Sequence, residues 1–151
     1  MKQFASLAEV AGFVGQSLQS TGWVTVTQQA INLFADATGD HQWIHVDEAR
    51  AKAGPFGGTI AHGFLTLSLL PQFLEGAFEI AGSGMGVNYG LNKVRFTTPV
   101  PANSRLRATL TLLACEPVEK GGIQMVWQVT VLREGTERPV CVAESVVRRY
   151  P

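Results

Sequence analysis

An acid and two imidazoles fall within six residues of one another, in the segment Asp40-His41-Gln42-Trp43-Ile44-His45. A carboxylate and a histidine that a turn brings together can hold one water and exchange protons near neutral pH. Asp40 and His45 are therefore the candidate acid–base pair. The simpler alternative is that Asp40 only bonds nearby backbone N–H groups and that His45 is a solvated surface histidine.

The spacing of the histidines also raises the hypothesis of a metal site, because His41 and His45 are four residues apart. Such a pair shares one face of a continuous helix, but Gly39 and the polar turn after it argue against a helix there. A third ligand would have to come from elsewhere, such as His62. We therefore expect no metal. We expect His41 to be solvated or to contact the Asp40–His45 pair without touching the substrate.

A third histidine precedes a glycine, in Ala61-His62-Gly63 at the start of an apolar run. A glycine at a helix start leaves backbone N–H groups free at the positive end of the helix dipole, where a developing oxyanion can bind. The alternative is that Gly63 only lets the helix pack closely on a sheet. His62 is most simply a packed, hydrogen-bonded histidine.

Two short helices are predicted on either side of the polar turn. Thr27 is a candidate N-cap for a helix over 28–38, which Gly39 can end in the left-handed conformation. Asp47 can cap a second helix over 48–52. The candidate pair thus lies in a loop held between two rigid elements, where catalytic groups concentrate.

The remaining pattern predicts one buried helix and a sheet. The run from Phe64 to about Leu74 is apolar without alternation, which indicates a buried helix, limited or kinked at Pro71. A period of two then prevails from Tyr89 onward. Strands are predicted at 22–26, 105–112, 124–131 and 140–147, with turns at 119–122 and 134–137. The fold class is α+β: an antiparallel sheet wrapped around a long central apolar helix, with short helices before it.

Composition narrows the classes of function. The 151 residues fit one domain, 1–151, and 12 basic residues balance 12 acidic ones, so neither nucleic acid nor an anionic membrane is an expected partner. A charged fraction of only 16% favours a homo-oligomer. Cys115 and Cys141 lie in apolar stretches, without metal or disulfide spacing. With no signal-peptide pattern and no apolar run long enough to span a bilayer, we expect a cytoplasmic protein.

The segment Phe34-Ala-Asp-Ala-Thr-Gly39-Asp40-His-Gln-Trp-Ile-His45-x5-Ala51 resembles the signature of the MaoC-like dehydratases, the (R)-specific enoyl-CoA hydratases also called hydratase 2. Gln42 and Trp43 depart from the family's Asn-Pro, and the loss of proline removes a fixed φ from the loop. The stretches 55–64 and 91–101 are similar to the approach to the family's central helix and to its following strand. Together these regions cover about 22–112.

The resemblance implies a hotdog fold, usually dimerised edge to edge, and hence a homodimer. It implies reversible syn hydration of a trans-2-enoyl-CoA to an (R)-3-hydroxyacyl-CoA, with one water held between Asp40 and His45. The backbone N–H of Gly63 is then the donor to the thioester oxygen. Candidate substrate contacts are Gln42, through its amide, His62 and Phe64. No cofactor is implied, since CoA is part of the substrate.

Two other functions are compatible with the sequence. A hotdog thioesterase would hydrolyse the acyl-CoA instead, but such enzymes resemble one another in carrying an acid on the central helix, and here none occurs before Glu75. A non-catalytic acyl-binding chain, or one half of a heterodimer, is the second alternative. The presence of both Asp40 and His45 favours a self-sufficient enzyme over it.

Overall fold

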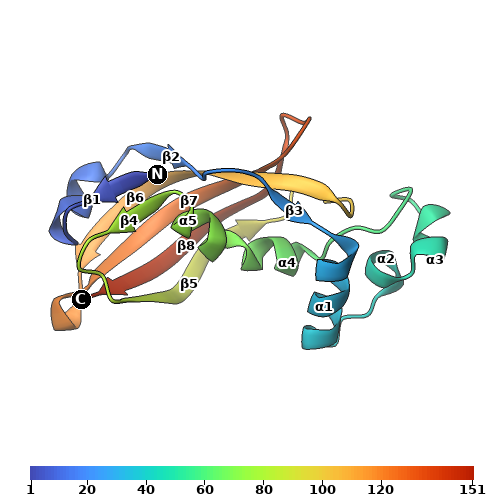
Figure 1. Ribbon diagram of the computed structural model, residues 1–151, viewed down its shortest axis with the longest axis horizontal. Helices are drawn as coiled ribbons and strands as arrows, with labels where there is room; N and C mark the ends of the chain where they lie inside the picture. Colours follow the sequence, from blue (N-terminus) through green and yellow to red (C-terminus); the bar gives the residue numbers. More distant parts are fainter.

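The computed structural model describes residues 1–151 and is built around a six-stranded antiparallel sheet (Figure 1). The strands follow the order β2-β6-β7-β8-β5, and β3 pairs with β6 beside β2. Their bounds are β2 Ser17–Gln19, β3 Val24–Val26, β5 Met85–Arg95, β6 Ser104–Pro117, β7 Ile123–Arg133 and β8 Pro139–Tyr150. A separate parallel pair joins β1 (Lys2–Phe4) to β4 (Phe78–Ile80).

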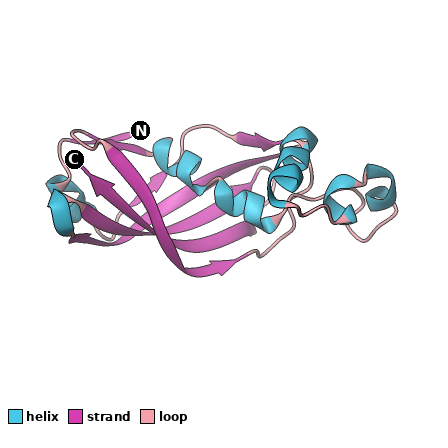
Figure 2. Cartoon of the chain, turned by 90° about the horizontal axis from the view of Figure 1, so that it is seen from below, coloured by secondary structure: helices cyan, strands magenta, loops and turns pink.

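The helices fall into two groups. In Figures 1 and 2, α4 (Gly63–Ser68) and α5 (Leu70–Glu75) lie along one face of the sheet. Three helices, α1 (Gln28–Thr38), α2 (Trp43–Val46) and α3 (Glu48–Lys52), gather beyond one end of the sheet, away from the end that holds both termini. Two 3-10 turns, η1 (Ala8–Phe13) and η2 (Glu119–Gly121), complete the chain. None of these helices has the length and apolar character needed to cross a membrane.

The predicted meander is confirmed in β6, β7 and β8. These strands pair in antiparallel register, with Leu110 opposite Val129 and Val129 opposite Ala143. Alternate side chains point to one covered face, because successive residues of a strand face opposite sides. The fully buried set in β6 and β7 is Leu106, Ala108, Leu110, Leu112, Met125, Trp127, Val129 and Val131.

The expected central helix is present only in interrupted form, with the expected limit near Pro71. The apolar run folds as two six-residue helices, α4 and α5, which meet at Leu69. Pro71 explains the break, because proline has no N–H to continue the ladder and restricts the residue before it. It occupies the first turn of α5, where its missing donor costs nothing.

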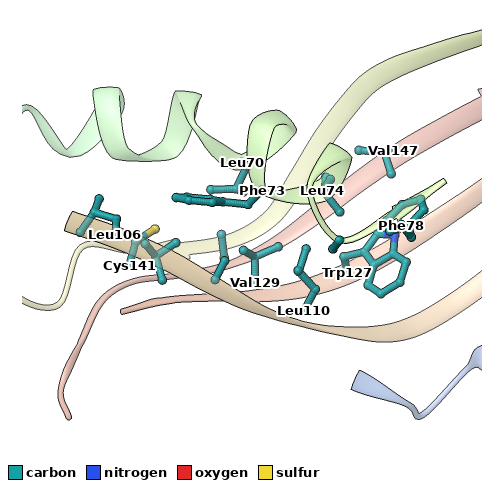
Figure 3. Packing of buried hydrophobic residues seen from close by; sticks show 14 of the residues in the cluster. Leu70, Phe73, Leu74, Phe78, Leu106, Leu110, Trp127, Val129, Cys141 and Val147 are labelled. Carbon is teal, nitrogen blue, oxygen red and sulfur yellow. The ribbon is translucent and has the colours of Figure 1, made fainter. Parts of the chain in front are cut away.

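The second helical segment closes the core (Figure 3). Leu70, Phe73 and Leu74 of α5 face the sheet, where the figure shows Leu106, Leu110, Val129 and Cys141 beneath them. Phe78 stacks on Trp127, with ring centroids 5.1 Å apart.

Both cysteines are free, and burial raises the pKa of the Cys141 thiol to about 11, so it serves as a small hydrophobic side chain.

Candidate active site

The two helix signals that frame the candidate pair are confirmed. Thr27 accepts a hydrogen bond from the N–H of Ala30 at 3.1 Å and starts α1. Gly39 adopts a φ of 80° and ends that helix, a conformation that glycine reaches without strain. Asp47 accepts from the N–H of Arg50 at 3.0 Å and starts α3. The turn between them is thereby fixed at both ends.

His45 is a buried residue, so the alternative of a solvated surface histidine is wrong. Only 6% of it is exposed, and its Nδ1 lies 2.7 Å from the carbonyl oxygen of Ile60. A carbonyl can only accept, so Nδ1 donates and the neutral ring carries its lone pair on Nε2. Burial lowers the pKa of His45, and the neighbouring His62 acts in the same direction. His45 therefore presents a bare Nε2 at neutral pH.

Asp40 both bonds nearby backbone and lies close to His45. Its Oδ1 accepts from the N–H of Gln42 at 3.3 Å, the backbone bond of the simpler alternative. The ligand atoms of Asp40, His45 and His62 nevertheless all lie within 4.8 Å of one another. The Asp40 side chain is 51% exposed, while the two rings are buried. A carboxylate that water can reach thus lies beside an imidazole that water cannot surround.

His62 is the packed, hydrogen-bonded histidine that the sequence indicated. It is 2% exposed, and its Nε2 donates to the backbone oxygen of Asp40 at 3.0 Å. Its ring stacks on that of His45, with centroids 3.9 Å apart and planes inclined by 27°. Phe34 lies on it as well, at 4.9 Å. Because so little of His62 is exposed, the geometry disfavours the direct substrate contact expected for it.

The spacing of these three groups is also one at which side chains can hold a metal ion. The Nε2 of His62 is committed to the backbone oxygen of Asp40, however, and its Nδ1 is fully buried, so His62 offers no accessible lone pair to an ion. His41 takes no part in this group. It bonds Asp36 at 2.9 Å on the exposed surface, so the pair of His41 and His45 is not a ligand pair. The arrangement suits proton transfer better than coordination.

Gly63 is the first residue of α4 and packs closely against a neighbouring ring. As the first residue of α4 it has an N–H outside the helical ladder. A Cβ there would lie 2.6 Å from the ring of Phe96, so the glycine also permits close packing. Gly63 lines a cavity of about 240 Å³ with Ile60 and Thr66, whereas Asp40 and His45 are not among its lining residues.

The other two expected contacts, Gln42 and Phe64, both lie on the surface. Gln42 is exposed at the start of α2. Phe64 is 67% exposed, so it does not belong to the core, and its ring meets Phe96 edge-on at 5.8 Å. Leu65, by contrast, is buried.

Trp43 replaces the conformational restriction of proline by packing. It is the first residue of α2, a position that favours proline in helices generally. The guanidinium of Arg50 lies 4.3 Å from its ring centre, and a Cβ on Gly54 would lie 3.0 Å from the same ring. The turn is thus held by contacts to α3 and to the residues after it.

Gln28 and Thr59 are two supporting residues that the sequence interpretation missed. The Gln28 amide donates to the carbonyl of His45 at 2.8 Å, and the Thr59 hydroxyl donates to the Gln28 side-chain oxygen. The N–H of Ile60 also donates to the carbonyl of Ile44 at 3.0 Å. No spacing in the sequence connects positions 28, 45 and 59, since only the fold brings them together.

A comparison with protein-family models decides the family. A model described as "MaoC like domain" matches residues 9–134. The chain belongs to the MaoC-like dehydratase family. The resemblance of its motifs to that family is confirmed, and the curled antiparallel sheet around helical segments is the family's hotdog fold.

The relatives of this MaoC-like protein include two that carry dehydratase or hydratase names. It is 53% identical over 148 residues to 3-hydroxyacyl-thioester dehydratase Z of Mycobacterium tuberculosis (strain ATCC 25618 / H37Rv), a match that covers 98% of each chain. It is 48% identical over 143 residues to nodulation protein N of Rhizobium leguminosarum bv. viciae, with 93% and 89% covered. The unliganded R-hydratase PhaJ1 of Pseudomonas aeruginosa superposes with a TM-score of 0.74 at 25% identity, covering 97% of this chain and 86% of that one. The protein is accordingly an enzyme of the hydro-lyase class.

Proposed function

We propose that this MaoC-like protein is an (R)-specific enoyl-CoA hydratase. It would add water reversibly and on one face to a trans-2-enoyl-CoA, and so form an (R)-3-hydroxyacyl-CoA. The observation that carries the proposal is the pairing of a tautomer-fixed histidine with an exposed carboxylate. The Nδ1 of His45 is committed to the carbonyl of Ile60, which leaves Nε2 as the free nitrogen, and a ring nitrogen of His45 lies within 4.8 Å of the Asp40 carboxylate.

This geometry supports a direction for the protons. The water gives one proton to Nε2 of His45 and holds its other hydrogen against the Asp40 carboxylate, while its oxygen attacks C3. The proton then passes from Nε2 to C2 on the same face, which gives syn addition and returns His45 to its neutral form. Atoms and electrons balance without an oxidant or reductant, so the proposal includes no metal, flavin or nicotinamide.

The thioester oxygen carries negative charge between these two steps. We assign its stabilisation to the backbone N–H of Gly63, which borders the cavity described above. One such donor contributes about 3–4 kcal/mol to transition-state stabilisation. Phe64 and Gln42 are both exposed, and we assign them contacts with the acyl-CoA outside the reacting centre.

A homodimer is the proposed assembly. One edge of the sheet is β5, and four apolar side chains are exposed along it: Met85, Val87, Tyr89 and Leu91. An exposed apolar edge strand is a template for pairing with another strand, and a second copy offers the same edge about a twofold axis. Light scattering on the purified protein should give twice the chain mass. The mass of one chain would contradict the dimer.

The two free thiols favour a reducing compartment, and we place the protein in the cytoplasm.

The decisive experiment uses crotonyl-CoA and the absorbance of its conjugated double bond. The wild-type protein should consume the substrate, and the hydrolysed product should be the (R)-3-hydroxy acid by chiral chromatography. Asp40→Asn should reduce turnover by at least about tenfold. The matched control is His41→Gln, which changes an exposed side chain next to Asp40 and should turn over like the wild type.

The outcomes separate the alternatives. Release of free CoA thiol that still depends on Asp40 would indicate a thioesterase. Against that alternative, neither α4 nor α5 offers an acid before Glu75. Binding of enoyl-CoA without turnover, at short and long chain lengths, would indicate an acyl-binding chain or one half of a heterodimer. Equal rates for the wild type and Asp40→Asn would remove the carboxylate from the mechanism.

A further inference from the structure

His62 is buried, makes one committed hydrogen bond and lies under the proposed base. Its Nε2 donates to the backbone oxygen of Asp40, so this nitrogen must carry a proton in every state that keeps the bond. The bond fixes the main chain of Asp40 rather than its carboxylate. The Oδ2 of Asp40 lies farther away, at 4.0 Å from the same nitrogen.

The other nitrogen of His62 has no partner among the side chains and backbone around it. Nδ1 is fully buried and makes no hydrogen bond in the protein. A proton on Nδ1 would leave a buried donor without an acceptor, whereas a proton on Nε2 is bonded to the Asp40 carbonyl, so the neutral ring carries its proton on Nε2.

Two aromatic rings pack against His62, one stacked on it and one tilted. Phe34 of α1 and His45 of α2 both contact it, at 4.9 and 3.9 Å between centroids. The His62 side chain therefore positions the His45 ring by stacking on it. Through its Nε2, it also positions the main chain of Asp40. A shift of His62 would alter the separation between the two groups that are to hold the water.

We propose that His62 is a positioning residue that carries its proton on Nε2 and holds the turn of Asp40 in register with the ring of His45. The two stacked histidines then carry opposite tautomers: the proton is on Nδ1 in His45 and on Nε2 in His62. The kinetic consequence rests on the hydratase function proposed above, whereas the tautomer itself does not depend on any activity.

Nitrogen-15 NMR of the histidine side chains in the full-length protein tests the tautomer directly. At neutral pH the Nδ1 of His62 and the Nε2 of His45 should both appear as unprotonated ring nitrogens. The spectra of His45→Gln and His62→Gln assign the signals, and the exposed His41 serves as the internal reference. A proton on Nδ1 of His62 at neutral pH would overturn the proposal, even if the protein hydrated no substrate at all.

Kinetics with two substitutions test the positioning role. His62→Phe keeps a ring in the stack but removes the donor to Asp40, and should lower kcat about ten- to a hundredfold with little change in KM, because small misplacements of reacting groups are costly. His62→Gln restores a donor and should recover part of the loss. A rise in KM with kcat intact would assign His62 a substrate contact instead. Wild-type kcat in a folded His62→Phe would refute the role.

Discussion

The sheet and the three-helix end of the molecule are stabilised in different ways. In β6 and β7 eight alternate side chains are fully buried, and burial of this kind depends on apolar area rather than on direction. In α1, α2 and α3 the buried residues are only Ile31, Ala35, His45 and Ala51. This end depends instead on directed hydrogen bonds between a few side chains and the backbone.

The contrast teaches that stability and activity should separate in this protein. Substitutions in the sheet remove apolar contacts and should weaken the whole fold without altering the site. Substitutions among the bonds around His45 remove little apolar area but change where the reacting atoms lie. The following experiments test that separation, beginning with the largest expected effect.

Replacement of the proposed base should separate the two properties most strongly. His45→Gln removes the Nε2 lone pair, so kcat for enoyl-CoA hydration should fall about 10²–10⁴-fold, while thermal unfolding stays cooperative. His41→Gln, which changes an exposed ring of the same loop, should keep both properties. Loss of the folded state in His45→Gln would show instead that the bond to Ile60 is chiefly structural.

A deletion in the sheet core should have the opposite signature. Leu110 is fully buried under α5, and Leu110→Ala should lower the free energy of unfolding by about 2–5 kcal/mol in urea titrations. The kcat of the protein that remains folded should match the wild type. A fall in kcat that parallels the loss of stability would mean that the two regions are coupled.

Gln28 should affect both properties to an intermediate degree. Gln28→Met keeps the shape of the side chain but leaves the Thr59 hydroxyl and the His45 carbonyl without this partner, at a cost of about 1–3 kcal/mol in the free energy of unfolding. The kcat should fall about tenfold because the backbone of His45 is released. Gln29→Met is the matched control, since Gln29 is the exposed neighbour on the same helix. Equal behaviour of the two variants would exclude Gln28 from positioning.

The dependence on pH should be the smallest and most specific effect. Burial lowers the pKa of His45 below 6.5, so the unfolded chain binds a proton more readily than the folded one. The contribution of His45 to stability is therefore complete above pH 6.5 and is lost as pH falls through the lowered pKa. The acid limb of kcat/KM should lie below 6.5 for the same reason.

His41 provides the control for this profile. Its hydrogen bond to Asp36 raises the pKa of His41, so its contribution has the opposite sign and is lost as pH rises through that value. Fluorescence-monitored unfolding and initial rates over a pH series should show the acid limb of activity unchanged in His41→Gln. If that limb moves in His41→Gln, the limb reports the titration of His41 and its assignment to His45 is incorrect.

Much of the fold could be predicted from local pattern. Thr27, Gly39 and Asp47 each act on neighbouring backbone, so the caps and bounds of α1 and α3 followed from residue type and spacing. The strands followed from alternation, as at Leu110 and Val129. The interruption of the apolar helix was indicated by Pro71, which restricts the residue before it, but the apolar pattern alone did not place the break at Leu69.

The composition of the site could be predicted, but its supporting contacts could not. Asp40 and His45 are close in the chain, and a turn is enough to bring them near each other. Gln28 and Thr59 reach His45 only because α1 and the segment before α4 pack on either side of α2. The burial of His45 and His62, and the stacking of their rings, also depend on elements far apart in sequence.

The sequence by itself thus determined which side chains can do chemistry here and which elements surround them, because caps, turns and alternation are set by neighbours along the chain. Only the tertiary structure decided how those side chains are protonated. Ile60 fixes the proton of His45 on Nδ1, the Asp40 backbone fixes that of His62 on Nε2, and burial keeps His45 uncharged at neutral pH. These properties arise from partners and from solvent exclusion, which exist only once distant segments have packed together.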